Sequence, residues 1–270
     1  MAVKNDIFIF GTHFPAMLFE FLTFIAVFLI AIIVFRKWRE RRTIATLYLS
    51  IALFSIAFAA FVAFTGLFSW FLSWIEMSYM NVYSPTYYTL SLPIGYCLVI
   101  PYDIFLIAFS IQIFLDKNQR KIIPFLISGL IIGALLFLPA NYWGVDPEPS
   151  DPASTRVIVL GLYLLYNTLV YILLAYFAFR EAGRTTHKLH RRGFQAIAWG
   201  FIGNILVFIF FLLDAILIML DPSSSGYSIF ISFAWITALI SSFLFYLGYI
   251  LPTWFRKRIE PNSHEVKDSS

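Results

Sequence analysis

The sequence predicts an all-α integral membrane protein, a polytopic bundle of seven transmembrane helices with the N-terminus outside and the C-terminus in the cytoplasm. Three observations lead to it: the composition, the length of the apolar runs and the placement of the basic residues. Of the 270 residues, 60% are hydrophobic and 13% are charged, against about 45–50% and about 25% in soluble globular domains. Charged groups are therefore too few to cover the surface of a soluble fold.

Seven runs are long and apolar enough to be spans, because a helix needs about 20 mostly apolar residues to cross a hydrocarbon core about 30 Å thick. They cover residues 14–35, 43–71, 91–115, 122–138, 157–179, 195–220 and 228–251. The fourth run is the shortest. We expect a single transmembrane domain over residues 1–258 and a polar cytoplasmic tail over residues 259–270.

The first three spans carry distinct local signals. Pro15 lies in the first turn of the first helix, where its missing N–H is harmless. The third span contains Pro101, which frees the carbonyl of Cys97 and predicts a kink. The second span repeats small residues at intervals of seven, a pattern that favours close helix packing in lipid; they are Ala45, Ala52, Ala59 and Gly66.

The later spans carry packing signals of the same kind. The fourth contains Gly129 and Gly133 in a GxxxG pair, and the sixth contains Gly200 and Gly203, which we expect at helix contacts. Polar and aromatic residues recur in the seventh span at spacings of three and four, so this stripe should face the bundle interior or a cavity. Its members are Ser228, Ser232, Trp235, Leu239, Ser242, Tyr246 and Tyr249.

Basic residues set the predicted orientation. All but two of the 19 Lys and Arg residues follow the first, third, fifth or seventh span, and only Lys4 and Arg156 fall on the other side. Short loops rich in Lys and Arg stay in the cytoplasm. The N-terminus is therefore expected outside, and the number of spans is expected to be odd. We interpret the basic rim as a contact with anionic lipid headgroups of the bilayer and not with nucleic acid.

Three acidic residues, Glu20, Asp103 and Asp214, interrupt the spans. A charged Asp at a helix centre costs about 2.5–3.5 kcal/mol on insertion scales, and no span contains a Lys or Arg to pair with it. We predict an outward-opening pocket between the first, third, fifth, sixth and seventh spans, with these acids at its wall and Asp103 deepest. Further candidates for this pocket are Tyr96, Ser110, Tyr163, Asn167, Tyr171 and Asn204.

A second interpretation of the same acids stays open. Each acid could be neutral and hydrogen-bonded to a Tyr, Ser or Asn, and so serve only to hold helices together. The two interpretations differ in whether a ligand reaches the carboxyl groups.

Signatures of an enzyme or a cofactor site are missing from the sequence. The seventh span has no Lys to form a retinal Schiff base, and the four His residues are not clustered with acids as metal ligands would be. No GxSxG or Walker motif occurs. We therefore expect no catalytic activity, no cofactor and no metal site.

The end of the seventh span reads Tyr246-Leu-Gly-Tyr-Ile-Leu-Pro252-Thr-Trp254-Phe-Arg256-Lys-Arg258. With the seven-helix, N-out topology, it resembles the exit of the seven-helix sensor region at the N-terminus of many prokaryotic histidine kinases. There, an aromatic-Gly-aromatic-x-x-Pro-x-Trp-x-Arg pattern leads into the cytoplasmic domains. The resemblance implies membrane-embedded sensing in a prokaryotic cell membrane. No kinase, cyclase or PAS segment fits after Arg258, so we expect output through a separate cytoplasmic partner.

Two basic clusters are candidate docking sites for that partner, with lipid contact as the alternative for both. One lies in the predicted loop between the fifth and sixth spans and comprises Arg180, Arg184, Lys188, Arg191 and Arg192, and the other comprises Arg256, Lys257 and Arg258. The sequence thus favours a receptor or sensor that binds a small or lipophilic ligand from the outer side. Two alternatives stay open: a small transporter or proton-coupled carrier that uses the intramembrane acids, and a non-catalytic subunit of a larger membrane complex.

Overall fold

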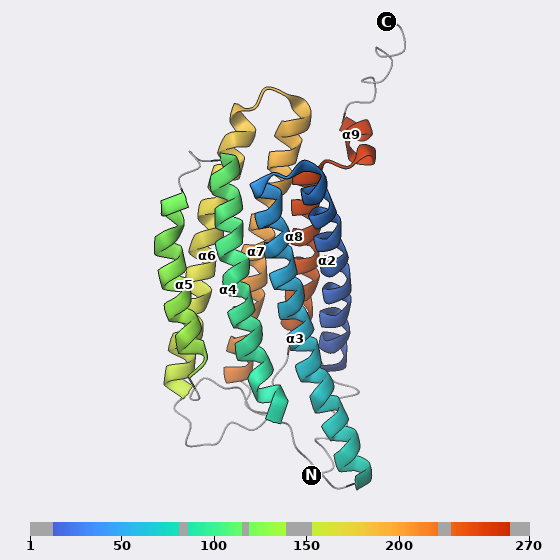
Figure 1. Cartoon of the computed structure of the whole chain (residues 1–270). Helices are drawn as coiled ribbons and strands as arrows, with labels where there is room; N and C mark the ends of the chain where they lie inside the picture. Colours follow the sequence, from blue (N-terminus) through green and yellow to red (C-terminus); the bar gives the residue numbers. More distant parts are fainter. Residues whose placement is uncertain (1–12, 81–85, 115–118, 139–152, 221–227, 260–270) are drawn as a thin grey trace, which may run out of the picture.

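A computed structural model describes residues 13–80, 86–114, 119–138, 153–220 and 228–259, and the secondary structure in these ranges is helical (Figure 1). The long helices run roughly parallel or antiparallel along one axis. In chain order the elements are α2 (His13–Arg41), α3 (Ile44–Met80), α4 (Thr86–Phe114), the 3₁₀ turn η1 (Gln119–Ile122), α5 (Ile123–Leu136), α6 (Ala153–Arg184), α7 (Lys188–Leu220), α8 (Ile229–Ile250) and α9 (Thr253–Ile259).

Six of these helices form a ring. Helices that follow one another pack side by side, α2 on α3, α3 on α4, α6 on α7 and α7 on α8, while α4 contacts α6 and α8 returns to α2. We call α2, α3, α4, α6, α7 and α8 the six-helix ring. Helix α5 lies beside this ring, against α4 and α6 (Figure 1). The first and last ring helices therefore close the bundle on itself.

The six ring helices are long and apolar enough to cross a membrane. These helices indicate a multi-pass membrane protein. The predicted fourth span, residues 122–138, corresponds to α5, which has 14 residues. At about 1.5 Å per residue, such a helix is about 21 Å long, shorter than a hydrocarbon core of about 30 Å. The described residues thus provide six full-length spans and one short helix beside them.

Several helices continue beyond their apolar runs. The predicted loop over residues 180–192 is mostly helical, because α6 extends to Arg184 and α7 begins at Lys188. Side chains three residues apart meet on a helix surface, and Arg184 Nη1 lies 3.2 Å from Glu181 Oε1 in this extension. In the third span, α4 runs through both Pro93 and Pro101, and the kink at Pro101 stays a prediction.

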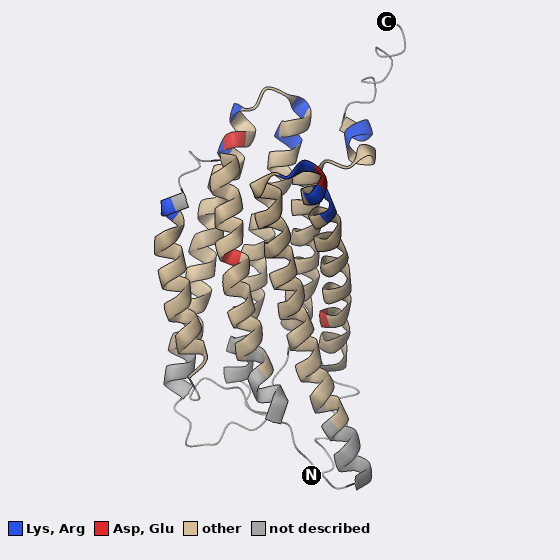
Figure 2. Cartoon of the chain, viewed as in Figure 1, with Lys and Arg blue, Asp and Glu red and all other residues tan. Residues whose placement is uncertain are grey.

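The Lys and Arg residues of the described ranges gather at one end of the bundle (Figure 2). They lie where α2 meets α3, where α6 meets α7, on η1 and on α9. We call this the basic end. The basic residues meet at one end because each of these segments follows an odd number of helices that run along the bundle, with α5 counted among them.

Small residues bring the helices of the ring close together. The four small residues of the second span are all buried, with Ala52 fully so, and a Cβ atom on Gly66 would overlap the side chain of Ser91 on α4. Near the basic end, a Cβ atom on Gly193 of α7 would lie 2.7 Å from the carbonyl oxygen of Gly248 on α8. Backbones can approach this closely only where no side chain separates them.

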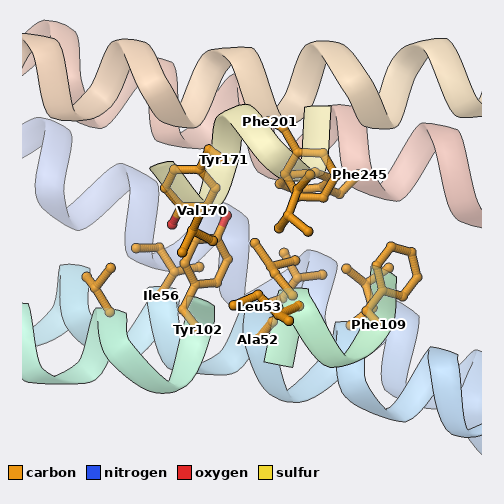
Figure 3. Packing of buried hydrophobic residues seen from close by; sticks show 14 of the residues in the cluster. Ala52, Leu53, Ile56, Tyr102, Phe109, Val170, Tyr171, Phe201 and Phe245 are labelled. Carbon is orange, nitrogen blue, oxygen red and sulfur yellow. The ribbon is translucent and has the colours of Figure 1, made fainter. Parts of the chain in front are cut away.

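Large apolar side chains fill the space between these contacts (Figure 3). Phe201 of α7 and Phe245 of α8 meet with ring centroids 4.9 Å apart, and both are fully buried. Farther along the bundle, Tyr102 of α4 and Tyr171 of α6 reach toward one another beside Ile56 of α3.

Candidate ligand-binding cavity

A cavity lies inside the six-helix ring. Every ring helix contributes to its wall, and α5 contributes no lining residue. The lining residues are Glu20 from α2, Ile56, Ala59 and Ala63 from α3, Gly95, Tyr96, Val99 and Tyr102 from α4, Tyr171 from α6, Asn204, Val207, Phe208 and Phe211 from α7, and Ile231, Trp235 and Ala238 from α8. The wall is thus mostly apolar and aromatic, as in ligand sites generally.

The cavity is large enough for more than one water molecule. About 40 Å³ is open to the centres of water-sized spheres, and one water needs only about 10–15 Å³ by that measure. The small side chains of Ala59 and Ala63 on α3, opposite the aromatic residues of α7, leave this space. The small-residue pattern of the second span therefore serves the cavity as well as helix packing.

Glu20 is the acid that reaches the cavity surface. Its side chain is 1% exposed, and its Oε1 accepts a hydrogen bond of 3.0 Å from Nε1 of Trp235 on α8. The Thr23 hydroxyl donates to the carbonyl oxygen of Trp235 at 3.2 Å, which adds a second link between α2 and α8. Glu20 Oε2 is buried and has no hydrogen-bond partner among the described residues, so one oxygen of this lining carboxyl group is unsatisfied.

Tyr102 and Asn204 form a second polar pair on the cavity wall. Asn204 Nδ2 of α7 donates to the Tyr102 hydroxyl of α4 at 2.6 Å, and this bond is buried. Both side chains line the cavity. This hydrogen bond joins α4 to α7. It gives the Asn204 amide N–H a partner, as buried polar groups usually require.

Asp103 lies behind the cavity wall and does not line it. It is fully buried on α4, and its Oδ1 accepts a hydrogen bond from the hydroxyl of Tyr171, a lining residue on α6. Asp103 Oδ2 has no hydrogen-bond partner within the described part of the chain. The acid that the sequence placed deepest in the pocket therefore contacts the cavity only through Tyr171.

Asp214 occupies a different place from the other two acids. Its Oδ1 accepts a hydrogen bond of 2.7 Å from the backbone N–H of Ser228, and Ser228 Oγ in turn accepts from the N–H of Phe230 at 3.2 Å. Ser228 is the N-cap of α8. Asp214 is absent from the lining residues and fixes the start of α8 against α7, since caps supply partners for the first N–H groups of a helix.

The remaining pocket candidates are buried away from the cavity lining, apart from Tyr96, which lines it. The ring of Tyr163 packs on Tyr96 with centroids 5.1 Å apart. Asn167 Nδ2 donates to the carbonyl oxygen of Tyr163 at 2.7 Å, within α6. Ser110 Oγ, Tyr163 Oη and Asn167 Oδ1 have no hydrogen-bond partner among the described residues. The structure thus brings four of the nine candidates to the cavity: Glu20, Tyr96, Tyr171 and Asn204.

Three aromatic lining residues had no functional signal in the sequence. Tyr102, Phe208 and Phe211 are aromatic residues within apolar runs, where such residues are common. The position of Tyr102 next to Asp103 was the only available hint. The described residues contain no group of three or more His, Cys, Asp or Glu side chains that could hold a metal ion.

Both predicted docking clusters lie at the basic end and are exposed there. In the α6–α7 cluster, Arg192 Nη1 donates to Gln195 Oε1 at 3.3 Å. In the α9 cluster, Arg256 Nε donates to the carbonyl oxygen of Leu251 at 2.6 Å, which ties α9 to the end of α8. The members named by the sequence are Arg180, Arg184, Lys188, Arg191, Arg192, Arg256, Lys257 and Arg258.

No family model, curated protein or solved structure matches the chain. Its function is therefore inferred from the cavity and the basic end.

Proposed function

We propose that this protein is a receptor or sensor of the cell membrane that binds a small, largely apolar ligand inside the six-helix ring. The observation that carries the proposal is the free carboxyl oxygen of Glu20, which lies in the wall of a cavity formed otherwise by mostly apolar side chains. A buried polar atom without a partner costs free energy. A ligand that supplies the missing hydrogen bond recovers that cost.

The ligand reaches the cavity from the outer side in this proposal. Basic residues mark the cytoplasmic side of membrane proteins, so the basic end is assigned to the cytoplasm. Glu20 lies near the start of α2 and Trp235 near the start of α8. Both helices end at the basic end, which places Glu20 and Trp235 in the opposite, outer half.

Close packing between the cavity and the basic end supports a receptor over a carrier. The Gly193–Gly248 contact joins the α7 and α8 backbones, and the Thr46 Oγ1 and Tyr249 Oη atoms lie 2.9 Å apart. The rings of Phe109 and Tyr249 meet edge to face with centroids 5.1 Å apart. A bound molecule would have to separate these contacts to pass toward the basic end.

Helix α8 is the proposed connection from the cavity to the cytoplasmic partner. It carries Trp235 at the cavity and Tyr249 near the basic end, and it leads through Leu251 into the basic helix α9. Small shifts of packed helices are a known route of signal transfer. The resemblance of residues 246–258 to the exit of the histidine-kinase sensor region supports an output at this end.

A proton-coupled carrier is the second candidate, and Asp103 is the observation that favours it. This carboxyl group is fully buried in the middle of α4, with one oxygen unpartnered among the described residues. Buried acids of this kind mark ion and proton pathways in membrane proteins. Flux of a ligand through liposomes that contain the protein would favour the carrier.

Native mass spectrometry of the gently extracted protein tests ligand binding directly. We expect a bound small molecule on the wild-type chain, and its loss in Ala63→Leu, because the larger side chain fills the cavity. Ala134→Leu, at an exposed position on α5, serves as the matched control and should retain the ligand. Both variants are first checked for a single symmetric peak in size-exclusion chromatography.

Two results would contradict the proposal. Retention of the bound molecule by a well-folded Ala63→Leu variant would place the ligand outside the cavity. A wild-type protein that carries no small molecule and co-purifies instead with a fixed protein subunit would favour the role of a complex subunit.

A further inference from the structure

We infer that the ligand is a small hydrophobic amine whose ammonium group binds Glu20 and whose apolar body lies among the aromatic side chains of the cavity. This inference rests on the proposed function, because it names the ligand class of the same cavity. Three features of the cavity support it: the unpartnered oxygen of Glu20, the lack of Lys and Arg among the described lining residues, and the aromatic rings of the wall.

Glu20 offers the cavity a hydrogen-bond acceptor that nothing else in the described chain uses. Oε1 is taken by the indole N–H of Trp235, whereas Oε2 is buried and unpartnered among the described residues. An ionised carboxylate only accepts hydrogen bonds, so a ligand that binds Glu20 in its charged form supplies a donor to Oε2. The Tyr102 and Asn204 side chains share one hydrogen bond, and Glu20 is the acidic residue among the described lining residues.

The charge around the cavity favours a cation. No Lys or Arg lies among the lining residues. A second acid, Asp103, stands directly behind the wall, where it is joined to the lining residue Tyr171. A buried charge is tolerated only when it is paired. An ammonium group would pair with an ionised Glu20, whereas an anion would find no basic partner among the described lining residues.

Aromatic rings that meet at right angles line the same cavity as Glu20. Phe211 meets Trp235 at an interplanar angle of 87° with centroids 6.1 Å apart, and Tyr96 meets Phe211 at 85° with centroids 6.2 Å apart. All three line the cavity with Glu20. Ring faces attract cations, and a combination of aromatic faces and a carboxylate is typical of ammonium recognition. Perpendicular rings present faces and edges together, which suits a cation with an apolar tail.

Binding of three matched probes to the full chain in phosphatidylcholine nanodiscs tests the ligand class. The probes are 2-phenylethylammonium, the neutral 2-phenylethanol and the anionic 3-phenylpropionate, and equilibrium dialysis against empty nanodiscs measures their affinities. We expect the amine to bind about tenfold or more tightly than the alcohol, as a charge-assisted hydrogen bond in a buried site implies. The anion should not bind above the empty-nanodisc background.

Variants then assign the preference to Glu20. Glu20→Gln keeps an amide oxygen for Trp235 but removes the charge, so we expect the amine to lose about tenfold in affinity while the alcohol changes by less than about twofold. Glu40→Gln alters an exposed acid at the basic end and should change neither affinity. If Glu20→Gln does not fold, the cavity-filling Ala63→Leu variant replaces it and should weaken amine binding.

The outcomes separate this inference from the proposed function. Equal affinity for amine and alcohol, or an amine affinity that Glu20→Gln leaves unchanged, overturns the amine assignment but leaves a ligand-binding cavity. A preference for the anion overturns it in the same way. If no probe binds and native mass spectrometry finds no bound molecule, the amine assignment and the proposed function fail together.

Discussion

At the scale of single residues, the hydrogen bond between Tyr171 and Asp103 decides how a fully buried carboxyl group is accommodated. Tyr171 supplies the hydrogen bond to Asp103 Oδ1, and Oδ2 has no partner among the described residues. Loss of the tyrosine hydroxyl would leave both oxygens of Asp103 without a described partner. An unsatisfied buried group is more costly than the net gain of an average hydrogen bond.

We therefore expect Tyr171→Phe to lower the free energy of unfolding by about 1–3 kcal/mol. Thermal unfolding in detergent, followed by circular dichroism, measures the change. Tyr176→Phe is the matched control, because Tyr176 lies on the same helix but is 60% exposed, and it should unfold as the wild type does. Equal stabilities of the two variants would show that Asp103 does not depend on Tyr171.

The acids also show where prediction from the sequence reaches its limit. Hydropathy alone identifies Glu20, Asp103 and Asp214 as unusual, because acids are rare in apolar spans. Their separate environments depend on partners that are far away in the chain: Glu20 bonds Trp235, 215 positions later, and Asp103 bonds Tyr171, 68 positions later. No local pattern indicates these pairs, so the sequence could not distinguish the acid at the cavity surface from the acid behind it.

At the scale of elements, the contact between α7 and α8 depends on two glycines. A Cβ atom on Gly248 would lie 2.5 Å from the carbonyl oxygen of Gly193 and 2.6 Å from a side-chain carbon of Ile197. The carbonyl oxygen belongs to the α7 backbone and cannot move without moving that helix, and the backbone nitrogen of Ile197 would also lie 3.0 Å from the added atom. The pair was not among the small-residue motifs of the sequence, because Gly193 precedes the predicted sixth span, residues 195–220, and Gly248 lies in the seventh.

We expect Gly248→Ala to separate α7 from α8 and to lower the free energy of unfolding by about 1–3 kcal/mol, as overpacking does. Gly183→Ala is the control, since a Cβ atom there meets no heavy atom within 4 Å. That substitution should be neutral or stabilising by up to about 1 kcal/mol, because alanine favours helix. Thermal unfolding of both variants under one set of conditions provides the comparison, and similar melting temperatures would contradict the close contact.

At the scale of the whole molecule, the sequence predicted the helical membrane bundle but missed one wall of the cavity. Composition and the length of the apolar runs indicated a helical membrane bundle, and the structure has six helices of spanning length where six of the seven runs lie. The predicted pocket joined the first and seventh spans but omitted the second, whose helix α3 contributes Ile56, Ala59 and Ala63 to the wall. That contribution follows from packing across the whole chain. Long-range packing of this kind leaves no periodic trace in the sequence.

The orientation of the whole molecule is tested by cysteine labelling of intact cells. After Cys97→Ala removes the single native thiol, we expect Thr186→Cys, in the exposed connection between α6 and α7, to react with a membrane-impermeant maleimide only after lysis. The sequence places Ser150 between α5 and α6, and Ser150→Cys should react before lysis. Reaction of Thr186→Cys in intact cells would invert the proposed topology and would place the cavity on the cytoplasmic side.

The position of α5 beside the ring has a consequence for how this chain can change over evolutionary time. Helix α5 carries the chain back from the basic end, so that α6 starts at the opposite end, yet it supplies no wall to the cavity. Much of its surface consists of outward-facing apolar side chains, among them Leu130 at 61% exposure. Selection on α5 is therefore expected to preserve its hydrophobicity and its passage back from the basic end. Its individual side chains are expected to vary more than those of the six ring helices.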